Sequence, residues 1–346
     1  MIFRQLFDHA SSTYTYLLGG AKGGEALIID PVLERVERYI QLLDELDLRL
    51  LKALDTHVHA DHVTGLGALR DRTRCVTVMG AESKVDVVSV RVGDGDHIDV
   101  EGVSLQAMHT PGHTSDSYCF RMADRVFTGD TLFVRGTGRT DFQHGDSHAA
   151  YESLFNKLLT LPDETLVYPG HDYKGETVST IGEERAHNPR LQVGSPEEYA
   201  ELMASLNLPN PKMMDIAVPA NLAIGATQGG SDLAWCLECA DAAAEMGRAD
   251  VVLVDLREDL ERQRDGVIPG SLHAPYADLE RFLSPGGILH YEGKTARKRL
   301  VYYCAFGERS ALAVKTSQEM GLADVCHVVG GMDAWSRFGG AVEQAG

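Results

Sequence analysis

The sequence has no long apolar run and few positive charges, and each absence excludes a class of function. No stretch of the 346 residues reaches the roughly 20 apolar positions that a membrane-spanning helix needs. The formal net charge is −19, because 32 Lys and Arg stand against 51 Asp and Glu. Nucleic acids and anionic membrane surfaces both attract basic patches, so we expect neither as a partner.

Cysteine is scarce as well. Six cysteines are too few for a disulfide scaffold in a chain of this length. The first residues, MIFRQLFDHASSTYTYLL, contain no basic segment followed by an apolar core, so we expect no signal peptide. These features predict a cytoplasmic protein with reduced thiols.

The chain is longer than one ordinary domain, and its pattern changes once. The first part alternates short β runs with a few helices, such as VLERVERYIQLLDEL, whose apolar residues have helical spacing. After the loose segment ATQGGSD, strand, loop and helix alternate, which predicts a mostly parallel sheet. We therefore predict an α/β protein with a first domain over residues 1–225, a linker over 226–231 and a second domain over 232–346.

Candidate metal ligands gather at the ends of predicted strands in the first domain. Four lie in one short segment, LDTHVHADH, and three occur singly in HTPGH, TGD and YPGH. The seven residues are His57, His59, Asp61, His62, His113, Asp130 and His171. Nitrogen and oxygen donors of this kind suit zinc or non-haem iron rather than calcium. The ligand set allows either one metal ion or a pair of zinc ions that activate a bridging hydroxide.

Together, the motifs THVHADH, HTPGHT, TGD and YPGH resemble the metallo-β-lactamase superfamily over about residues 1–225. This resemblance implies an αββα sandwich with the site at one edge of two sheets. The wider segments GRTDFQ, YPGHDYKG, STIGEERAHNPRL and NLPNPKMMDIAVPAN look like its persulfide dioxygenase branch. The rival branch is glyoxalase II, a thioester hydrolase with two zinc ions.

The dioxygenase resemblance implies one Fe(II) ion per domain, held by His57, His113 and Asp130. Two histidines and one carboxylate form a facial triad with open coordination positions. The residues expected to orient the ligands and water around it are His59, Asp61, His62 and His171, and Asp141 is expected to hold Arg139 or the loop of the site. The implied reaction oxidises glutathione persulfide with O2 to sulfite and glutathione. The candidate contacts to the anionic substrate are Arg139, Tyr173, Lys174 and Arg190.

A second candidate site lies in VYYCAFGERSALAVK, where Cys304 directly follows an apolar strand and Arg309 opens a helix. Such a loop can aim backbone N–H groups and a helix N-terminus at the sulfur, which stabilises a thiolate. Cys236 and Cys239 form a CxxC pair with no second pair to complete a zinc site. We expect these two cysteines to share one helix face rather than to bind metal.

Residues from about 232 to 343 resemble a rhodanese domain, through VVLVDLRE, GVIPGSLHAPY, CAFGERS and VVGGMDAW. The resemblance implies transfer of sulfane sulfur between thiosulfate or sulfite and glutathione persulfide, with Cys304 and Arg309 as catalytic residues. The chain departs from the family at Val267, where histidine is common, and in a loop that is not strongly basic. Those departures bear on the preferred sulfur donor and acceptor.

The whole chain thus resembles a persulfide dioxygenase fused to a rhodanese, with both activities acting on one sulfur pool. Because the iron family often forms dimers, a homodimer is also expected. The rival to this bifunctional enzyme is a two-zinc hydrolase joined to a rhodanese domain that only carries sulfur.

Overall fold

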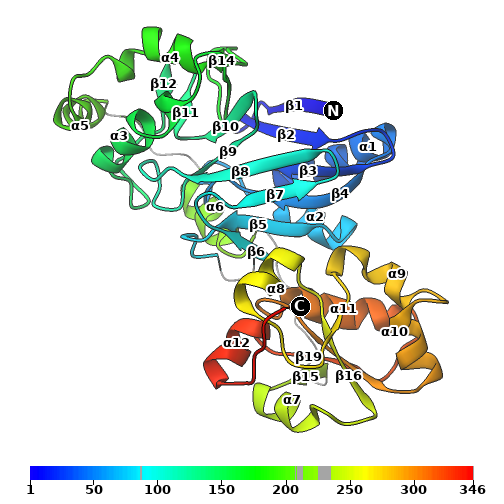
Figure 1. Cartoon of the computed structure of the whole chain (residues 1–346). Helices are drawn as coiled ribbons and strands as arrows, with labels where there is room; N and C mark the ends of the chain where they lie inside the picture. Colours follow the sequence, from blue (N-terminus) through cyan, green and yellow to red (C-terminus); the bar gives the residue numbers. More distant parts are fainter. Residues whose placement is uncertain (86–87, 207, 209–212, 225–234, 346) are drawn as a thin grey trace. The chain divides into compact units, whose positions relative to one another are not determined.

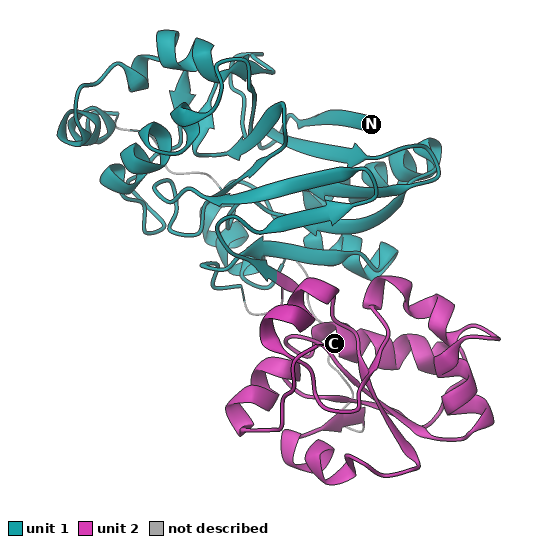
Figure 2. Ribbon diagram, viewed as in Figure 1, with its two compact units in different colours: residues 1–85, 91–226 teal, residues 86–90, 227–346 magenta. Residues whose placement is uncertain are grey.

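The computed structural model describes residues 1–346 except 86–87, 207, 209–212, 225–234 and 346 (Figure 1). The chain divides into two compact units (Figure 2). Unit 1 comprises Met1–Val85 and Arg91–Ala226, and unit 2 comprises Asp86–Val90 and Thr227–Gly346. The predicted linker, 226–231, lies outside the described residues.

Unit 1 contains two six-stranded sheets and one small hairpin. The first sheet has the order β1 (Ile2–Asp8), β2 (Thr13–Gly19), β3 (Glu25–Ile29), β4 (Arg49–Leu54), β5 (Val76–Gly80), β6 (Val90–Val92). The second has the order β14 (Ser179–Thr180), β13 (Leu166–Pro169), β10 (Arg125–Gly129), β9 (Tyr118–Arg121), β8 (Val103–His109), β7 (His97–Val100). The hairpin joins β11 (Leu132–Phe133) to β12 (Gly136–Thr137).

Aromatic side chains fill the space between the two sheets. Phe3 and Tyr16 of the first sheet meet Phe127 of the second at ring-centroid distances of 6.2 and 4.9 Å. Tyr168 lies 5.0 Å from Phe3 in an edge-to-face arrangement. Aromatic pairs at these separations add to the free energy gained by burying their surface. This layer joins the two sheets into one core.

Helices cover the outer faces of both sheets. They are α1 (Val36–Leu46), α2 (Leu66–Thr73), α3 (Ser147–Phe155), α4 (Ile181–His187), α5 (Pro196–Ala204) and α6 (Met214–Asn221). The predicted first helix is confirmed as α1, which buries Val36, Tyr39, Leu42 and Leu43 on one face. Residues of α3, α4 and α5 form one buried cluster with strands of the second sheet. The αββα sandwich implied by the resemblance is therefore confirmed.

Unit 2 is built on a five-stranded sheet with the order β15 (Cys236–Leu237), β19 (Val325–Val328), β18 (Arg299–Tyr303), β16 (Val251–Asp255), β17 (Leu272–His273). All four strand pairs are parallel, as predicted. The helices are α7 (Cys239–Glu245), α8 (Asp259–Asp265), α9 (Leu279–Leu283), α10 (Ile288–His290), α11 (Glu308–Glu319) and α12 (Gly331–Phe338). Two buried clusters form the core of this unit.

The expectation that Cys236 and Cys239 share a helix face is wrong. Cys236 lies in β15, opposite His327 of β19, and Cys239 is the first residue of α7. The reason is tertiary: hydrogen bonding to β19 holds Cys236 in an extended conformation, and the helix starts only afterwards.

Among the helices of the described ranges, none combines the length and the apolar character required to cross a bilayer.

A buried ion pair fastens α11 to α8 in unit 2. The Arg309 guanidinium donates to both carboxylate oxygens of Glu261 at 2.6 and 2.9 Å, and both side chains are at most 1% exposed. Removing one partner of such a pair leaves an uncompensated charge in the interior.

We predict that Glu261→Ala lowers the free energy of unfolding of unit 2 by about 3–5 kcal/mol. Urea denaturation followed by tryptophan fluorescence isolates this unit, because both tryptophans of the chain, Trp235 and Trp335, belong to it. Asp250→Ala is the matched control, since it breaks the exposed pair with Arg248. It should leave the midpoint unchanged, and equal effects of the two substitutions would contradict the prediction.

Candidate metal centre and persulfide loop

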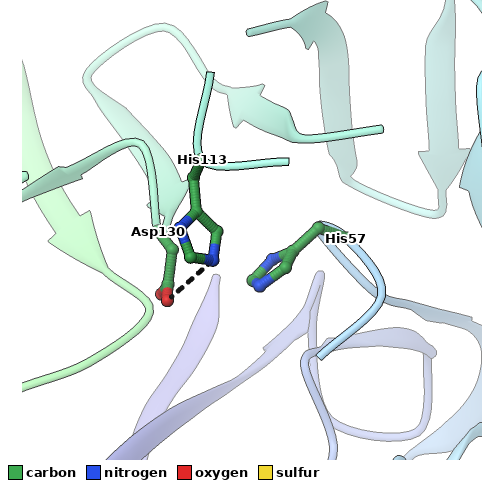
Figure 3. Close-up of side chains that lie close together, drawn as sticks. All are labelled: His57, His113 and Asp130. Atoms are coloured by element: carbon green, nitrogen blue, oxygen red, sulfur yellow. Dashed lines mark ion pairs between the residues drawn. The ribbon is translucent and has the colours of Figure 1, made fainter. Parts of the chain in front are cut away.

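Strand ends bring three metal donors of unit 1 to one point. His57 follows β4, His113 follows β8 and Asp130 follows β10, and the donor atoms of all three lie within 4.8 Å of one another. Figure 3 shows the two imidazoles facing the carboxylate, with His113 Nε2 3.6 Å from Asp130 Oδ2. All three residues are buried. Two imidazole nitrogens and one carboxylate oxygen in this arrangement fit a single divalent metal ion.

Hydrogen bonds behind the two histidines fix which nitrogen faces the centre. Nδ1 of His113 lies 2.8 Å from the backbone carbonyl of Arg139, so it must be the protonated nitrogen. Nδ1 of His57 lies 3.0 Å from the hydroxyl of Thr56, which itself donates to Asp30. Both Nε2 lone pairs are thus left for a ligand. Burial lowers the pKa of His57 well below its usual value, and the charge of His59 lowers it further, which keeps the ring neutral.

The third donor is held by His171. Its Nδ1 lies 2.6 Å from Asp130 Oδ1, and its Nε2 lies 2.9 Å from Asp61 Oδ2. Burial raises the pKa of Asp130, but the imidazole of His171 outweighs it, and the net pKa is well below the usual range. With Oδ1 engaged by His171, Oδ2 is the oxygen that remains for a metal.

The other predicted donors form a group next to the triad. The donor atoms of His59, Asp61 and His62 also lie within 4.8 Å of one another. His59 Nε2 lies 3.2 Å from Asp30, and His62 Nδ1 lies 2.9 Å from Asp61. In the part of the chain that the structure describes, His59 Nδ1 and His62 Nε2 have no hydrogen-bond partner. All seven predicted donors are therefore brought together, in two groups that His171 connects.

Arg139 extends from the backbone that orients His113. Its guanidinium donates twice to Asp141, at 2.6 Å each, and lies 4.6 Å from the centre of the Phe142 ring. Phe142 in turn meets His113 edge to face at 5.8 Å. Asp141 thus fixes the guanidinium beside the triad.

Two other predicted substrate contacts line a groove of about 590 Å³. Tyr173 is 71% exposed, and its ring stacks parallel to that of His171 at 5.9 Å. The lining residues are Gln5, Phe7, His9, Ser12, Tyr14, Asp172, Tyr173, Lys174, Gly175 and Thr177. Arg190 is not among them, because its guanidinium turns back and donates to the carbonyl of Thr137.

Sequence reasoning missed the polar residues that hold the ligands. Thr13 donates to Asp61 at 2.9 Å and lies 3.2 Å from His171 Nε2. Asp30 accepts from both the amide and the hydroxyl of Thr56. The position of Asp30 directly after the apolar strand GEALII was a usable signal, whereas nothing in the sequence marks Thr13.

In unit 2, Cys304 directly follows β18 and is 1% exposed. Its Sγ accepts the amide N–H of Gly307 at 3.1 Å, and Gly307 can turn the loop because its φ is +93°. The amides at the start of α12, Met332 and Asp333, donate to the carbonyls of Cys304 and Ala305. The Arg309 guanidinium donates to the Glu261 carboxylate and to the backbone carbonyl of Ser89, contacts that support a role in holding the loop, and its charge also acts on Cys304.

Comparison with known proteins identifies both units by class. Residues 10–87 and 80–171 match the family model of the metallo-beta-lactamase superfamily, and residues 238–338 match that of the rhodanese-like domain. The structure of a metallo-beta-lactamase from Staphylococcus aureus is 24% identical and covers 95% of this chain, with a TM-score of 0.61, which supports the fold alone.

Within the superfamily, two relatives define the branch. Human mitochondrial persulfide dioxygenase ETHE1 is 47% identical over 228 residues, which cover 65% of this chain and 89% of that protein. The crystal structure of ETHE1 from Myxococcus xanthus is 55% identical, with a TM-score of 0.64, and covers 65% of this chain and all of the other. The chain therefore belongs to the ETHE1 persulfide dioxygenase family, and it carries a rhodanese domain in addition.

A glycine packs directly against the metal ligands. A Cβ atom on Gly138 would lie 2.0 Å from the carbonyl of Asp130 and 2.9 Å from Nδ1 of His113. By contrast, a Cβ atom on Gly136 would meet nothing closer than 3.7 Å.

We predict that Gly138→Ala lowers the affinity for the metal by roughly 10- to 100-fold, because it displaces groups that orient two ligands. Gly136→Ala, two residues earlier at the start of β12, is the control and should bind metal like the wild type. Anaerobic titration with Fe(II), with bound iron determined by mass spectrometry, measures both. Equal affinities of the two variants would show that the packing at Gly138 does not position the ligands.

Proposed function

We propose that unit 1 is an Fe(II)-dependent dioxygenase that oxidises glutathione persulfide. One persulfide, one O2 and one water give one glutathione, one sulfite and two protons. The observation that carries this proposal is the buried triad of His57, His113 and Asp130 in a chain of the ETHE1 family. The fold implies a metal, and two imidazoles with one carboxylate are the donor set that non-haem iron oxygenases use.

The residues around the triad prepare the site for this chemistry. When bound, an Fe(II) ion supplies open coordination positions at which a persulfide sulfur and O2 can meet. The backbone of Arg139 and the hydroxyl of Thr56 keep Nε2 of His113 and His57 directed inward. His171 keeps the Asp130 carboxylate ionised beside these two histidines. Because these groups are fixed before substrate arrives, little reorganisation is needed during the reaction.

Glutathione persulfide carries two carboxylates, and the site offers cationic and phenolic donors for them. The groove beside His171 contains Tyr173 and Lys174, which can donate to a carboxylate or to the sulfur. Near Thr137, Arg190 has no carboxylate partner among the described residues, so its charge remains available to substrate. Arg139 lies beside the triad, held by Asp141. We assign glutathione recognition to these four residues.

For unit 2 we propose thiosulfate sulfurtransferase activity through Cys304. The Cys304 thiolate attacks the sulfane sulfur of thiosulfate, the sulfur–sulfur bond breaks, and sulfite leaves with the bonding electrons. A glutathione thiolate then takes the outer sulfur and releases the Cys304 thiolate. The reverse reaction consumes sulfite, which is the product proposed for unit 1. Joining the two activities in one chain raises the local concentration of the shared intermediates.

The alternative for unit 1 is a two-zinc thioester hydrolase of the glyoxalase II type. The specific observation in its favour is the second donor group of His59, Asp61 and His62, with two unpartnered imidazole nitrogens among the described residues. Metal analysis separates the two functions, since the dioxygenase requires one iron per chain and the hydrolase two zinc ions. Cleavage of S-lactoylglutathione without O2 consumption would favour the hydrolase.

We predict that the two activities can be removed independently. Asp130→Ala should lose iron and reduce oxygen uptake with glutathione persulfide to background, while sulfur transfer from thiosulfate persists. Cys304→Ser should do the reverse, because it removes the nucleophile and leaves the triad intact. An oxygen electrode and a sulfite assay follow the first reaction, with zinc-loaded protein as the control. No oxygen uptake by iron-loaded wild type would refute the dioxygenase.

We also predict that Arg139→Ala raises KM for glutathione persulfide by about tenfold at unchanged kcat, through the loss of a charge-assisted hydrogen bond. Iron content should stay the same, because His113 is oriented by the backbone carbonyl of residue 139. Arg38→Ala is a suitable control, since that arginine forms an exposed pair with Glu45 in α1. An unchanged KM would exclude the Arg139 side chain from substrate binding.

A further inference from the structure

A series of side chains in contact leads from Cys304, in the loop after β18, to Cys236, the first cysteine of the CxxC pair. Cys304 Sγ lies 3.7 Å from Ser310 Oγ, which lies 3.2 Å from Nδ1 of His327. Nε2 of His327 lies 3.5 Å from Cys236 Sγ. The four residues come from the loop after β18, from α11, from β19 and from β15. Strand pairing places Cys236 directly opposite His327.

These side chains are unusual for their position in the fold. Ser310 is fully buried and His327 is 5% exposed, between the valines of β19 and the apolar side chains that surround α11. Polar groups in such a place lower stability unless they are hydrogen-bonded, and apolar residues would pack there without that requirement. Cys236, the last residue in this series of contacts, is only half-buried. The arrangement therefore calls for a role beyond packing.

We propose that Ser310 and His327 are positioning residues that favour the thiolate form of Cys304, and that Cys236 selects the tautomer of His327. This inference rests on the proposed sulfur transfer through Cys304. The Cys236 thiol donates to Nε2 of His327, which places the ring proton on Nδ1. That N–H donates to Ser310 Oγ. The one hydroxyl hydrogen of Ser310 has two acceptors within reach, the Gly307 carbonyl at 3.0 Å and the Cys304 sulfur at 3.7 Å, and it turns to the sulfur when Cys304 is ionised, because an anion is the stronger acceptor.

In this arrangement two neutral donors face the anionic sulfur, namely the Gly307 amide and the Ser310 hydroxyl. Burial lowers the pKa of His327, so its ring is neutral and carries a single N–H. When a glutathione thiolate attacks the outer sulfur of the Cys304 persulfide, a new sulfur–sulfur bond forms and the old one breaks. The bonding electrons go to Cys304 Sγ, where the two donors stabilise the charge, and no further reactant is needed.

The charged groups packed around this path are largely neutralised by one another. Arg309 of α11 pairs with Glu261 of α8, and Glu308 acts on Arg309 from the same helix. Burial raises the pKa of Cys326 to about 12, so this neighbour of His327 stays a neutral thiol. The remaining nearby charges form the pairs Arg299–Glu245, Arg299–Asp324 and Arg337–Asp333. The charge of Arg309 also acts on Cys304, but Glu261 balances it, so substitution of the neutral donors changes Cys304 without breaking an ion pair.

The test is the pH dependence of iodoacetamide reaction at Cys304 in the full-length protein, followed by peptide mass spectrometry. Ser310→Ala and His327→Leu should move the midpoint upward and slow the reaction at neutral pH by about tenfold, as expected for one lost hydrogen bond to an anion. His327→Asn should restore most of the rate, because its amide can donate from the position of Nδ1. Cys236→Ala should shift the midpoint in the same direction by a smaller amount.

Two matched controls separate positioning from general damage. Ser317→Ala removes another buried hydroxyl of α11, one that bonds to Tyr302 and the Ala313 carbonyl. Cys326→Ala changes the residue next to His327 that belongs to the other buried cluster. Both should keep the wild-type midpoint.

Unshifted midpoints in folded Ser310→Ala and His327→Leu would overturn the inference. Should Ser310→Ala fail to fold by tryptophan fluorescence, the comparison of His327→Leu with His327→Asn decides, and equal midpoints there would also overturn it. Mass analysis of the wild type after thiosulfate treatment tests the underlying function separately. Absence of a persulfide on Cys304 would refute the sulfurtransferase, whereas a persulfide with unshifted variants would refute only the positioning roles.

Discussion

The imidazole of His171 is the contact on which the metal centre depends. It bonds to Asp130 with one nitrogen and to Asp61 with the other, and these carboxylates follow strands of different sheets. Without a group between them, the two like charges would raise each other's pKa and push the strand ends apart. The hydroxyl of Thr13 adds a third contact at the start of β2. The contacts of His171 thus both hold the two sheets together at this edge and keep the Asp130 carboxylate ionised.

The sequence allowed the convergence of the candidate ligands to be predicted, but not the residues that hold them. His113, Asp130 and His171 each follow a strand, and strand ends of one sheet meet at one edge, so the spacing of these motifs was enough to predict their convergence. Thr13 begins β2 and Thr56 follows β4, and each bonds to a carboxylate far away in the sequence, Thr13 to Asp61 and Thr56 to Asp30. Local spacing carries no information about such contacts. The same limit explains the error at Cys236, where a strand partner overrides the helical pattern.

The two units solve the same physical problem in different ways. The proposed reactions require an ionised carboxylate in unit 1 and an anionic sulfur in unit 2, each inside an apolar framework where burial favours the neutral form. Unit 1 uses charge, since imidazoles surround Asp130 and hold its pKa down. In unit 2, the loop 304–309 contains one basic side chain, Arg309, and this side chain is paired with Glu261. The groups in contact with the Cys304 sulfur are the Gly307 amide and the Ser310 hydroxyl, and the charge of Arg309 also acts on Cys304.

This difference has a consequence for the substrates that unit 2 can use. A cationic loop attracts small dianions over a distance and raises their rate of encounter, whereas neutral donors act only on contact. In a protein with a net charge of −19, a loop without free positive charge gains nothing from long-range attraction of thiosulfate or sulfite. The neutral donors instead stabilise the Cys304 thiolate as the sulfur–sulfur bond breaks. Because every transfer releases this same thiolate, the stabilisation does not depend on the sulfur donor or acceptor. In the proposed sulfur transfer, selection between them comes from contacts to the organic part of the thiol, and glutathione offers more such contacts than an inorganic ion.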